Sequence, residues 1–127
     1  MMQFETVIHD GTVVTPSETF KADIGINGGV IAAVAERIAG GERRIDAGGR
    51  LVMPGGIEGH CHIAQESSSG VMAADDYYSG SVSAAFGGNS TFIPFAAQHR
   101  GQSIADVIAT YDGRAAPNSV LDYSYHL

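Results

Sequence analysis

The sequence of 127 residues predicts an α/β fold in two segments, residues 1–50 and 51–127. In the first segment, apolar and polar residues alternate in short runs, the period-two pattern of half-buried strands. In the second, candidate strands alternate with candidate helices, which favours parallel βα units. Glycine contributes 17 residues, mostly in pairs without a fixed period. Such pairs mark turns between short elements, not a collagen repeat or a flexible linker.

The clearest strand of the first segment covers residues 20–26, where apolar and polar positions alternate. Asn27-Gly28-Gly29 follows, and these residues tolerate positive φ, so a hairpin to an apolar run at 30–34 is expected. Further short strands are expected at 6–8, 12–14 and 44–47. Residues 1–50 therefore predict a small antiparallel sheet.

The second segment is expected to open with extended residues at 51–53 and 57–63, separated by Pro54-Gly55-Gly56. A helix capped by Asp75 then ends at Gly87-Gly88, and a strand follows at 91–95. The expected apolar stripe of this helix consists of Tyr78, Val82, Ala85 and Phe86.

Ser103 and Asp106 resemble a capping box, which predicts the start of a second helix. Its expected apolar stripe is Ile104, Val107, Ile108 and Tyr111. Pro117 breaks this helix, and a third strand is expected at 120–126. Three parallel strands with two crossovers would leave long open edges, so we expect the chain to be the front part of a larger fold.

Composition excludes several classes of function. The chain has seven basic and fourteen acidic residues, a net charge of -7, and Lys21 as its one lysine, which argues against a nucleic-acid surface. It lacks an apolar run of the ~20 residues that a membrane span needs, and its N-terminus does not resemble a signal peptide. The single Cys61 fits a reducing compartment. We therefore expect a cytoplasmic chain without nucleic-acid or membrane partners.

His60 and His62 are the candidate metal ligands. Two positions apart on a strand, their imidazoles project from one face and can converge on one cation. Imidazole binds several transition metals, so the pattern leaves the metal open. Glu58 has the same parity and can orient a ligand from the second shell or bind directly. Cys61 faces the other side and is expected to be a small buried thiol. Taken alone, His-x-His is equally compatible with two structural histidines.

The residues that precede the two histidines favour metal ligands over structural histidines. Pro54-Gly55-Gly56-Ile57-Glu58-Gly59-His60-Cys61-His62 resembles the Pro-Gly-x-Ile-Asp-x-His-x-His strand of the amidohydrolase superfamily. The resemblance is closest to the dihydropyrimidinase and hydantoinase family of cyclic amidases. It continues in register through Asp75–Gly80, Ala84–Thr91, Gln98–Ser103 and Asp122–His126.

This resemblance implies part of a β-sandwich in residues 1–50. For residues 51–127 it implies the first three β/α units of a TIM-like (β/α)₈ metal-dependent hydrolase barrel, in truncated form. It implies a divalent metal, usually zinc and binuclear in the complete enzyme, with His60 and His62 as the first two ligands. The substrate would be a small cyclic amide or ureide, attacked by a metal-bound hydroxide. The complete family enzyme is commonly a homotetramer.

The family's remaining parts, a bridging lysine, two more histidines and a catalytic aspartate, have no counterpart here, so no catalytic residue is expected in this chain. Lys21 does not align with the bridging lysine, and Glu58 replaces the family's aspartate. His99 and His126 are expected at the rim of the site, with ligation as the alternative, and His9 is expected to be structural.

The loop at 64–74 is either a flexible connector or part of the family's substrate lid, in which case Val71 and Met72 would contact substrate. The leading function is a cyclic amidase. The alternatives are a non-catalytic interaction protein like the collapsin response mediator proteins, or an amidohydrolase acting on allantoin or dihydroorotate.

Overall fold

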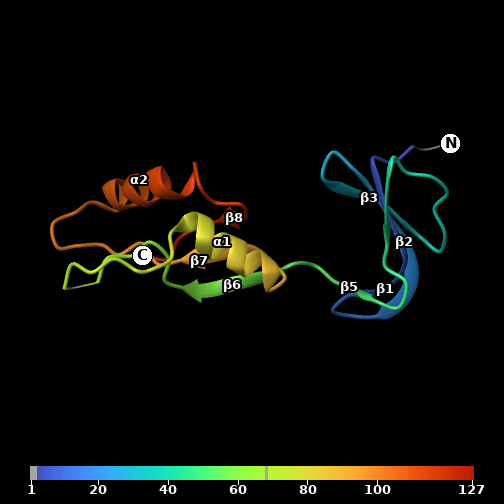
Figure 1. The fold of residues 1–127 in the computed structure, drawn as a ribbon, viewed down its shortest axis with the longest axis horizontal. Helices are drawn as coiled ribbons and strands as arrows, with labels where there is room; N and C mark the ends of the chain where they lie inside the picture. Colours follow the sequence, from blue (N-terminus) through green and yellow to red (C-terminus); the bar gives the residue numbers. More distant parts are fainter. Residues whose placement is uncertain (1–2, 68) are drawn as a thin grey trace. The chain divides into compact units, whose positions relative to one another are not determined.

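The computed structural model describes residues 3–67 and 69–127, and the chain divides into two compact units, Met1–Pro54 and Gly55–Leu127 (Figure 1). Each unit has its own sheet and its own buried apolar cluster. Within the described residues, neither helix has the length and hydropathy that crossing a membrane requires.

The first unit is a five-stranded mixed sheet with β1 as its central strand. Its strands are β1 (Thr6–Val14), β2 (Thr19–Asn27), β3 (Val30–Ala35), β4 (Arg43–Asp46) and β5 (Leu51–Val52). β2 runs antiparallel to β1 and β3, whereas β4 and β5 run parallel to β1. The prediction of an antiparallel sheet is therefore wrong for β4, and β5, which was expected to open the second segment, belongs to this first sheet. Tight hairpins join the antiparallel strands, but longer connections bring β4 and β5 back in the direction of β1.

The predicted hairpin between β2 and β3 is confirmed. Asn27 pairs with Val30, which leaves Gly28 and Gly29 as a two-residue loop. Both glycines have positive φ, 56° and 75°, as turns of this length require. The two short strands expected at 6–8 and 12–14 are parts of β1, whose pairing with β2 is irregular between Ile8 and Gly11.

A buried polar network stabilises the first unit. The ring of His9 donates from Nδ1 to Asp23 Oδ2 at 3.1 Å, and Arg44 Nε donates to His9 Nε2 at 3.1 Å. Asp23 also accepts hydrogen bonds from the backbone amides of Asp10 and Ile38. Burial alone would raise the pKa of Asp23, but these hydrogen bonds and the His9 ring lower it. His9 thus has the structural role expected of it.

The second unit is a parallel three-stranded sheet with two helices, which confirms the predicted alternation of strands and helices. Its elements are β6 (Gly56–Cys61), α1 (Tyr77–Phe86), β7 (Asn89–Pro94), α2 (Ile104–Ala115) and β8 (Asp122–Tyr123), with sheet order β6-β7-β8. α1 and α2 contact one another and pack on the sheet (Figure 1). The third strand is shorter than expected.

Both helices begin with side-chain caps. Asp76, and not the predicted Asp75, caps α1: its carboxylate accepts from the Ser79 amide, and the Ser79 hydroxyl accepts from the Asp76 amide. These hydrogen bonds lower the pKa of Asp76. Ser103 caps α2 as predicted, accepting from the amide of Asp106 at 3.1 Å.

The apolar stripe predicted for α1 is wrong. The buried face consists of Tyr77, Gly80 and Ser81, whereas Phe86 is 91% exposed. A Cβ added at Gly80 would lie 2.7 Å from Ile63 Cδ1. The absence of a side chain at Gly80 therefore allows α1 to lie close to Ile63, which follows β6. Hydrophobic periodicity does not detect a helix face made of small residues. In α2, Val107 and Tyr111 are buried as predicted, but Ile104 and Ile108 are exposed.

Candidate metal centre

His60 and His62 lie side by side at the C-terminal end of β6. Their ring centroids are 5.6 Å apart, and both side chains belong to exposed residues. Each ring also packs on the phenyl ring of Phe95, at 4.8 Å for His60 and 5.0 Å for His62. Both imidazoles therefore occupy one side of the strand, as the alternation of side chains requires.

This arrangement fits two ligands of a single cation. With Zn–N bonds of about 2.0–2.1 Å, two imidazoles on one zinc ion place their ring centres roughly 5 Å apart. The observed separation of 5.6 Å is close to that value. Within residues 3–67 and 69–127, no group of three or more histidine, cysteine, aspartate and glutamate side chains is arranged to hold a metal. The two histidines are therefore two candidate ligands, and the described residues do not group a third such side chain with them.

Gln65 orients the ring of His62. His62 Nδ1 lies 2.5 Å from Gln65 Oε1, so this ring nitrogen is engaged in a hydrogen bond. Nε2 is then the ring nitrogen that is available to a metal. A hydrogen bond from the second ring nitrogen is the usual way in which a protein fixes a metal-binding histidine.

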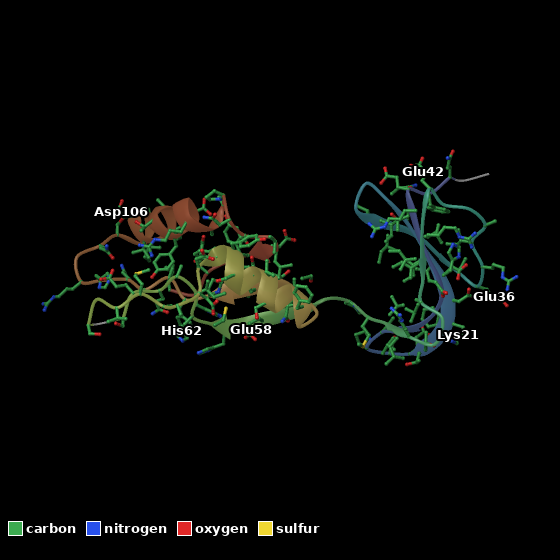
Figure 2. All side chains as sticks on the ribbon, viewed as in Figure 1. Lys21, Glu36, Glu42, Glu58, His62 and Asp106 are labelled. Carbon is green, nitrogen blue, oxygen red and sulfur yellow. The ribbon has the colours of Figure 1, made fainter. Side chains whose placement is uncertain are left out.

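Glu58 acts on the backbone of the motif. Its carboxylate Oε1 accepts a hydrogen bond of 2.9 Å from the amide of His60. Glu58 and His62 both extend from the region of β6, as Figure 2 shows. In this conformation, Glu58 holds the strand at the first histidine and does not complete a three-ligand cluster.

His126 reaches the same phenyl ring from the segment after β8, the edge strand on the other side of β7. Its imidazole stacks on Phe95 at a centroid distance of 5.1 Å, and Nε2 donates to the carbonyl oxygen of Gly59 at 2.7 Å. This hydrogen bond ties the segment after β8 to β6, which gives His126 a structural role at the rim. His99 lines a separate small pocket beside α2.

Cys61 packs against the core of the second unit. Burial, followed by the charge of Glu58, raises the pKa of its thiol. The thiol is partly buried, and its packing places it on the core side of the strand. This matches the prediction that Cys61 faces away from the two histidines.

The loop after the metal motif is folded back on itself. Glu66 and Met72 form an antiparallel bridge, and the amide of Ala73 donates to the carbonyl oxygen of Gln65 at 2.8 Å. An open groove of about 400 Å³ lies along this loop. The groove is lined by His62, Gln65, Ser67, Val71, Met72 and Ala73. Val71 and Met72, the expected apolar contacts, thus border the second histidine; Ser68 of this loop lies outside the described residues.

Sequence reasoning missed Phe95 and Gln65. The register of the parallel strands could have indicated Phe95, because its amide donates to the carbonyl oxygen of Cys61. Carboxyl ends of parallel strands meet at one edge, so Phe95, the residue that follows β7, lies beside His60 and His62. Gln65 gave no comparable signal, since the turn that brings it to His62 is not predictable from spacing.

No family model matches the chain. Its sequence is 40% identical over 123 residues to the D-hydantoinase of Ralstonia pickettii, covering 97% of the chain and 27% of the relative. The dihydropyrimidinase of Rattus norvegicus is 33% identical over 131 residues, covering 98% of the chain and 25% of the relative. Over nearly its whole length, the chain is therefore similar in sequence to hydantoinases and dihydropyrimidinases.

The solved structures agree with this similarity. A structure of D-hydantoinase superposes with a TM-score of 0.91 at 40% identity, covering 97% of this chain and 27% of that one. The fold described above is therefore that of the N-terminal region of a hydantoinase. The chain spans about a quarter of the length of the relatives that it matches.

Proposed function

We propose that the chain is the N-terminal part of a metal-dependent cyclic amidase that hydrolyses the ring amide of hydantoins or dihydropyrimidines. The observation that carries this proposal is the pair of exposed imidazoles, 5.6 Å apart, at the end of β6. It is supported by relatives named D-hydantoinase and dihydropyrimidinase that match nearly the whole chain.

In this proposal, residues 1–50 contribute to a β-sandwich and residues 51–127 form the first three β/α units of a TIM-like barrel. The parallel order β6-β7-β8 with its two helices is compatible with the start of such a barrel. The homotetramer that the family resemblance implies belongs to the same proposal, as do the cytoplasmic location and the absence of nucleic-acid and membrane partners that the composition predicts.

His60 and His62 would hold the divalent metal, for which we propose zinc. A divalent cation at this position supplies Lewis-acid polarisation of a carbonyl group and activation of water. Gln65 engages Nδ1 of His62 and leaves Nε2 available to the metal, and Glu58 fixes the backbone of His60. Phe95 closes the side of both rings against which it packs.

The groove beside His62 would receive the substituent of the ring. Val71 and Met72 provide its apolar contacts, and both side chains are largely exposed in this structure, at 65% and 46%. A bound substrate that covers them would gain roughly 25 cal/mol for each Å² of apolar surface removed from water. No general acid or base is assigned to this chain.

The proposal can be tested in a chimera of the D-hydantoinase of Ralstonia pickettii, in which these residues replace the matching region. We expect the folded chimera to hydrolyse hydantoin or dihydrouracil, with allantoin and dihydroorotate as comparison substrates. His60→Asn and His62→Asn should each reduce hydrolysis by at least about a hundredfold, since even outer contacts of metal ligands are worth 10–100-fold. His99→Asn is the matched control and should leave the rate unchanged.

Two results would count against the proposal. One is a folded chimera whose hydrolysis rate is unaffected by both histidine substitutions. The other is hydrolysis by the 127-residue chain alone, because the proposal assigns the remaining ligands and the catalytic aspartate to other parts of the polypeptide. If the chimera does not fold, the zinc titration at the end of the Discussion tests the same pair of histidines directly.

A non-catalytic interaction protein is the second candidate. It would not need two exposed imidazoles side by side on one face of a strand, and His60 and His62 have this arrangement. The same chimera distinguishes the two candidates, since only the enzyme predicts loss of hydrolysis on substitution of either histidine.

A further inference from the structure

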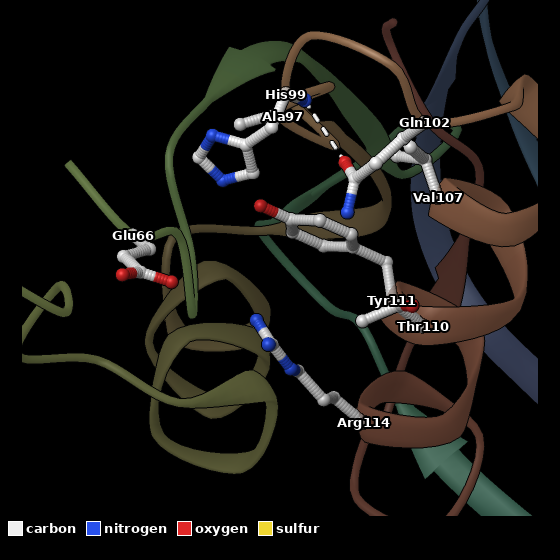
Figure 3. Close-up of a pocket in the computed structure, with 8 residues that line it drawn as sticks. All are labelled: Glu66, Ala97, His99, Gln102, Val107, Thr110, Tyr111 and Arg114. Carbon is white, nitrogen blue, oxygen red and sulfur yellow. Dashed lines mark hydrogen bonds between the residues drawn. The ribbon is translucent and has the colours of Figure 1, made fainter. Parts of the chain in front are cut away.

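A second, smaller pocket lies beside α2 and shares no lining residue with the groove at His62. Its volume is about 100 Å³, enough for several water molecules or a ligand of a few heavy atoms. Its polar lining consists of Glu66, His99, Gln102, Thr110, Tyr111 and Arg114 (Figure 3).

Tyr111 places a hydroxyl group in this pocket. The residue is only 4% exposed, and Figure 3 shows its hydroxyl directed toward the space between His99 and Glu66. A phenolic hydroxyl can donate as well as accept, so it can donate to a ligand that enters the pocket from solvent.

Arg114 brings a positive charge to the same space. Its Nη1 donates to the carbonyl oxygen of Ala64, and its Cζ lies 5.1 Å from the ring centroid of Tyr111. The part of the chain that the structure describes contains no carboxylate within ion-pair distance of this guanidinium. Several of its N–H donors therefore have no partner, in the planar array that matches a carboxylate.

Gln102 adds a third donor. Its Oε1 accepts a hydrogen bond of 2.9 Å from the amide of His99, which leaves the NH₂ group of the side chain directed into the pocket (Figure 3). Three donors from Tyr111, Arg114 and Gln102 thus face a space whose one anionic group is the carboxylate of Glu66. The chain as a whole carries a charge of -7, so it does not attract anions non-specifically.

We propose that this pocket is a binding site for a small carboxylate, of the size of acetate. Tyr111 and Arg114 donate to the two carboxylate oxygens, and Gln102 contributes a third hydrogen bond. Glu66 opposes the ligand's charge and keeps the affinity low. The site is independent of the proposed metal centre.

The test is a titration of the ¹⁵N-labelled chain with sodium acetate, with sodium chloride balanced to hold the ionic strength constant. We expect the Nε–Hε resonance of Arg114 to shift and saturate. Tyr111→Phe should weaken binding by roughly five- to tenfold, the loss of one hydrogen bond of about 1 kcal/mol or more. Glu66→Gln should tighten binding, because it removes the opposing charge. Tyr78→Phe, at an exposed tyrosine of α1, is the matched control and should change nothing.

Three outcomes would overturn the proposal: a shift that does not saturate, an equal effect of Tyr111→Phe and Tyr78→Phe, or weaker acetate binding in Glu66→Gln. The last would indicate a pocket built for a ligand that donates to Glu66. Tyr111→Phe removes a single oxygen atom, so the fold is expected to persist, and the dispersed amide spectrum of each variant verifies this before the titration.

Discussion

Arg114 Nη1 donates a hydrogen bond of 2.9 Å to the carbonyl oxygen of Ala64, 50 residues earlier in the sequence. Ala64 has a positive φ of 49°, an uncommon conformation for a residue with a side chain. Its amide donates to the carbonyl oxygen of Asp75. Contacts from α2 and from the start of α1 thus hold the turn that begins two residues after His62.

Arg114→Met tests this relationship, because methionine keeps much of the apolar stem and removes every donor. We expect a loss of about 1–3 kcal/mol in the free energy of unfolding, the usual range for a hydrogen bond from a charged group. Urea denaturation measures this loss, provided that the free energy of unfolding depends on urea concentration with the same slope in both proteins. Arg100→Met, at an exposed position, should change stability by less than about 0.5 kcal/mol. Equal effects of the two substitutions would contradict the role given to Arg114.

Gly80 and Gly113 provide a matched pair of helical glycines. A Cβ at Gly80 would meet Ile63 at 2.7 Å, whereas a Cβ at Gly113 meets nothing within 4 Å. Gly80→Ala should therefore destabilise the chain by about 1–3 kcal/mol through overpacking. Gly113→Ala should stabilise it by about 0.5–1 kcal/mol through helix propensity. Thermal or urea unfolding measures both, and an increase in stability for Gly80→Ala would mean that α1 does not approach Ile63 closely.

Asp23 should make the first unit sensitive to acid. Its pKa is lowered from the ordinary value of 3.8, so its contribution to stability is present above that pH and is lost as pH falls through the lower, folded-state pKa. Asp23→Asn should reduce stability by about 1–3 kcal/mol at pH 7, because the hydrogen bonds from Asp10, Ile38 and His9 lose their charged acceptor. The difference between Asp23→Asn and the unsubstituted chain should shrink as the pH falls below 3.8. A difference that does not change with pH would show that the charge of Asp23 is not what these donors require.

Local signals predicted much of the fold. Asn27-Gly28-Gly29 predicted the hairpin because a two-residue loop needs positive φ, and Ser103 predicted the start of α2 because its side chain satisfies a free amide. Two adjacent aspartates, Asp75 and Asp76, are equally suited to cap α1, so the choice between them depends on the approach of the chain. The parallel pairing of β4 and β5 with β1 is set by contacts that are distant in sequence and leave no local pattern.

The sequence predicted the strand that carries the candidate site. The spacing of His60 and His62 determines that both rings share a face, and the structure places both on Phe95. The contacts that orient the rings were not predictable. Gln65 reaches His62 through a turn at Ala64, and His126 reaches Gly59 across 67 residues of sequence.

The proposed metal centre requires His60 and His62 to act as one metal-binding pair. A zinc titration of the chain, followed through the ¹⁵N resonances of the histidine rings, tests this. With two donors the affinity should be weak, but both rings should respond together and saturate at one zinc ion per chain. His62→Asn should abolish the response of His60 to low zinc concentrations, and His99→Asn should leave it intact. Independent responses of the two rings, or a His60 response that persists in His62→Asn, would contradict the account.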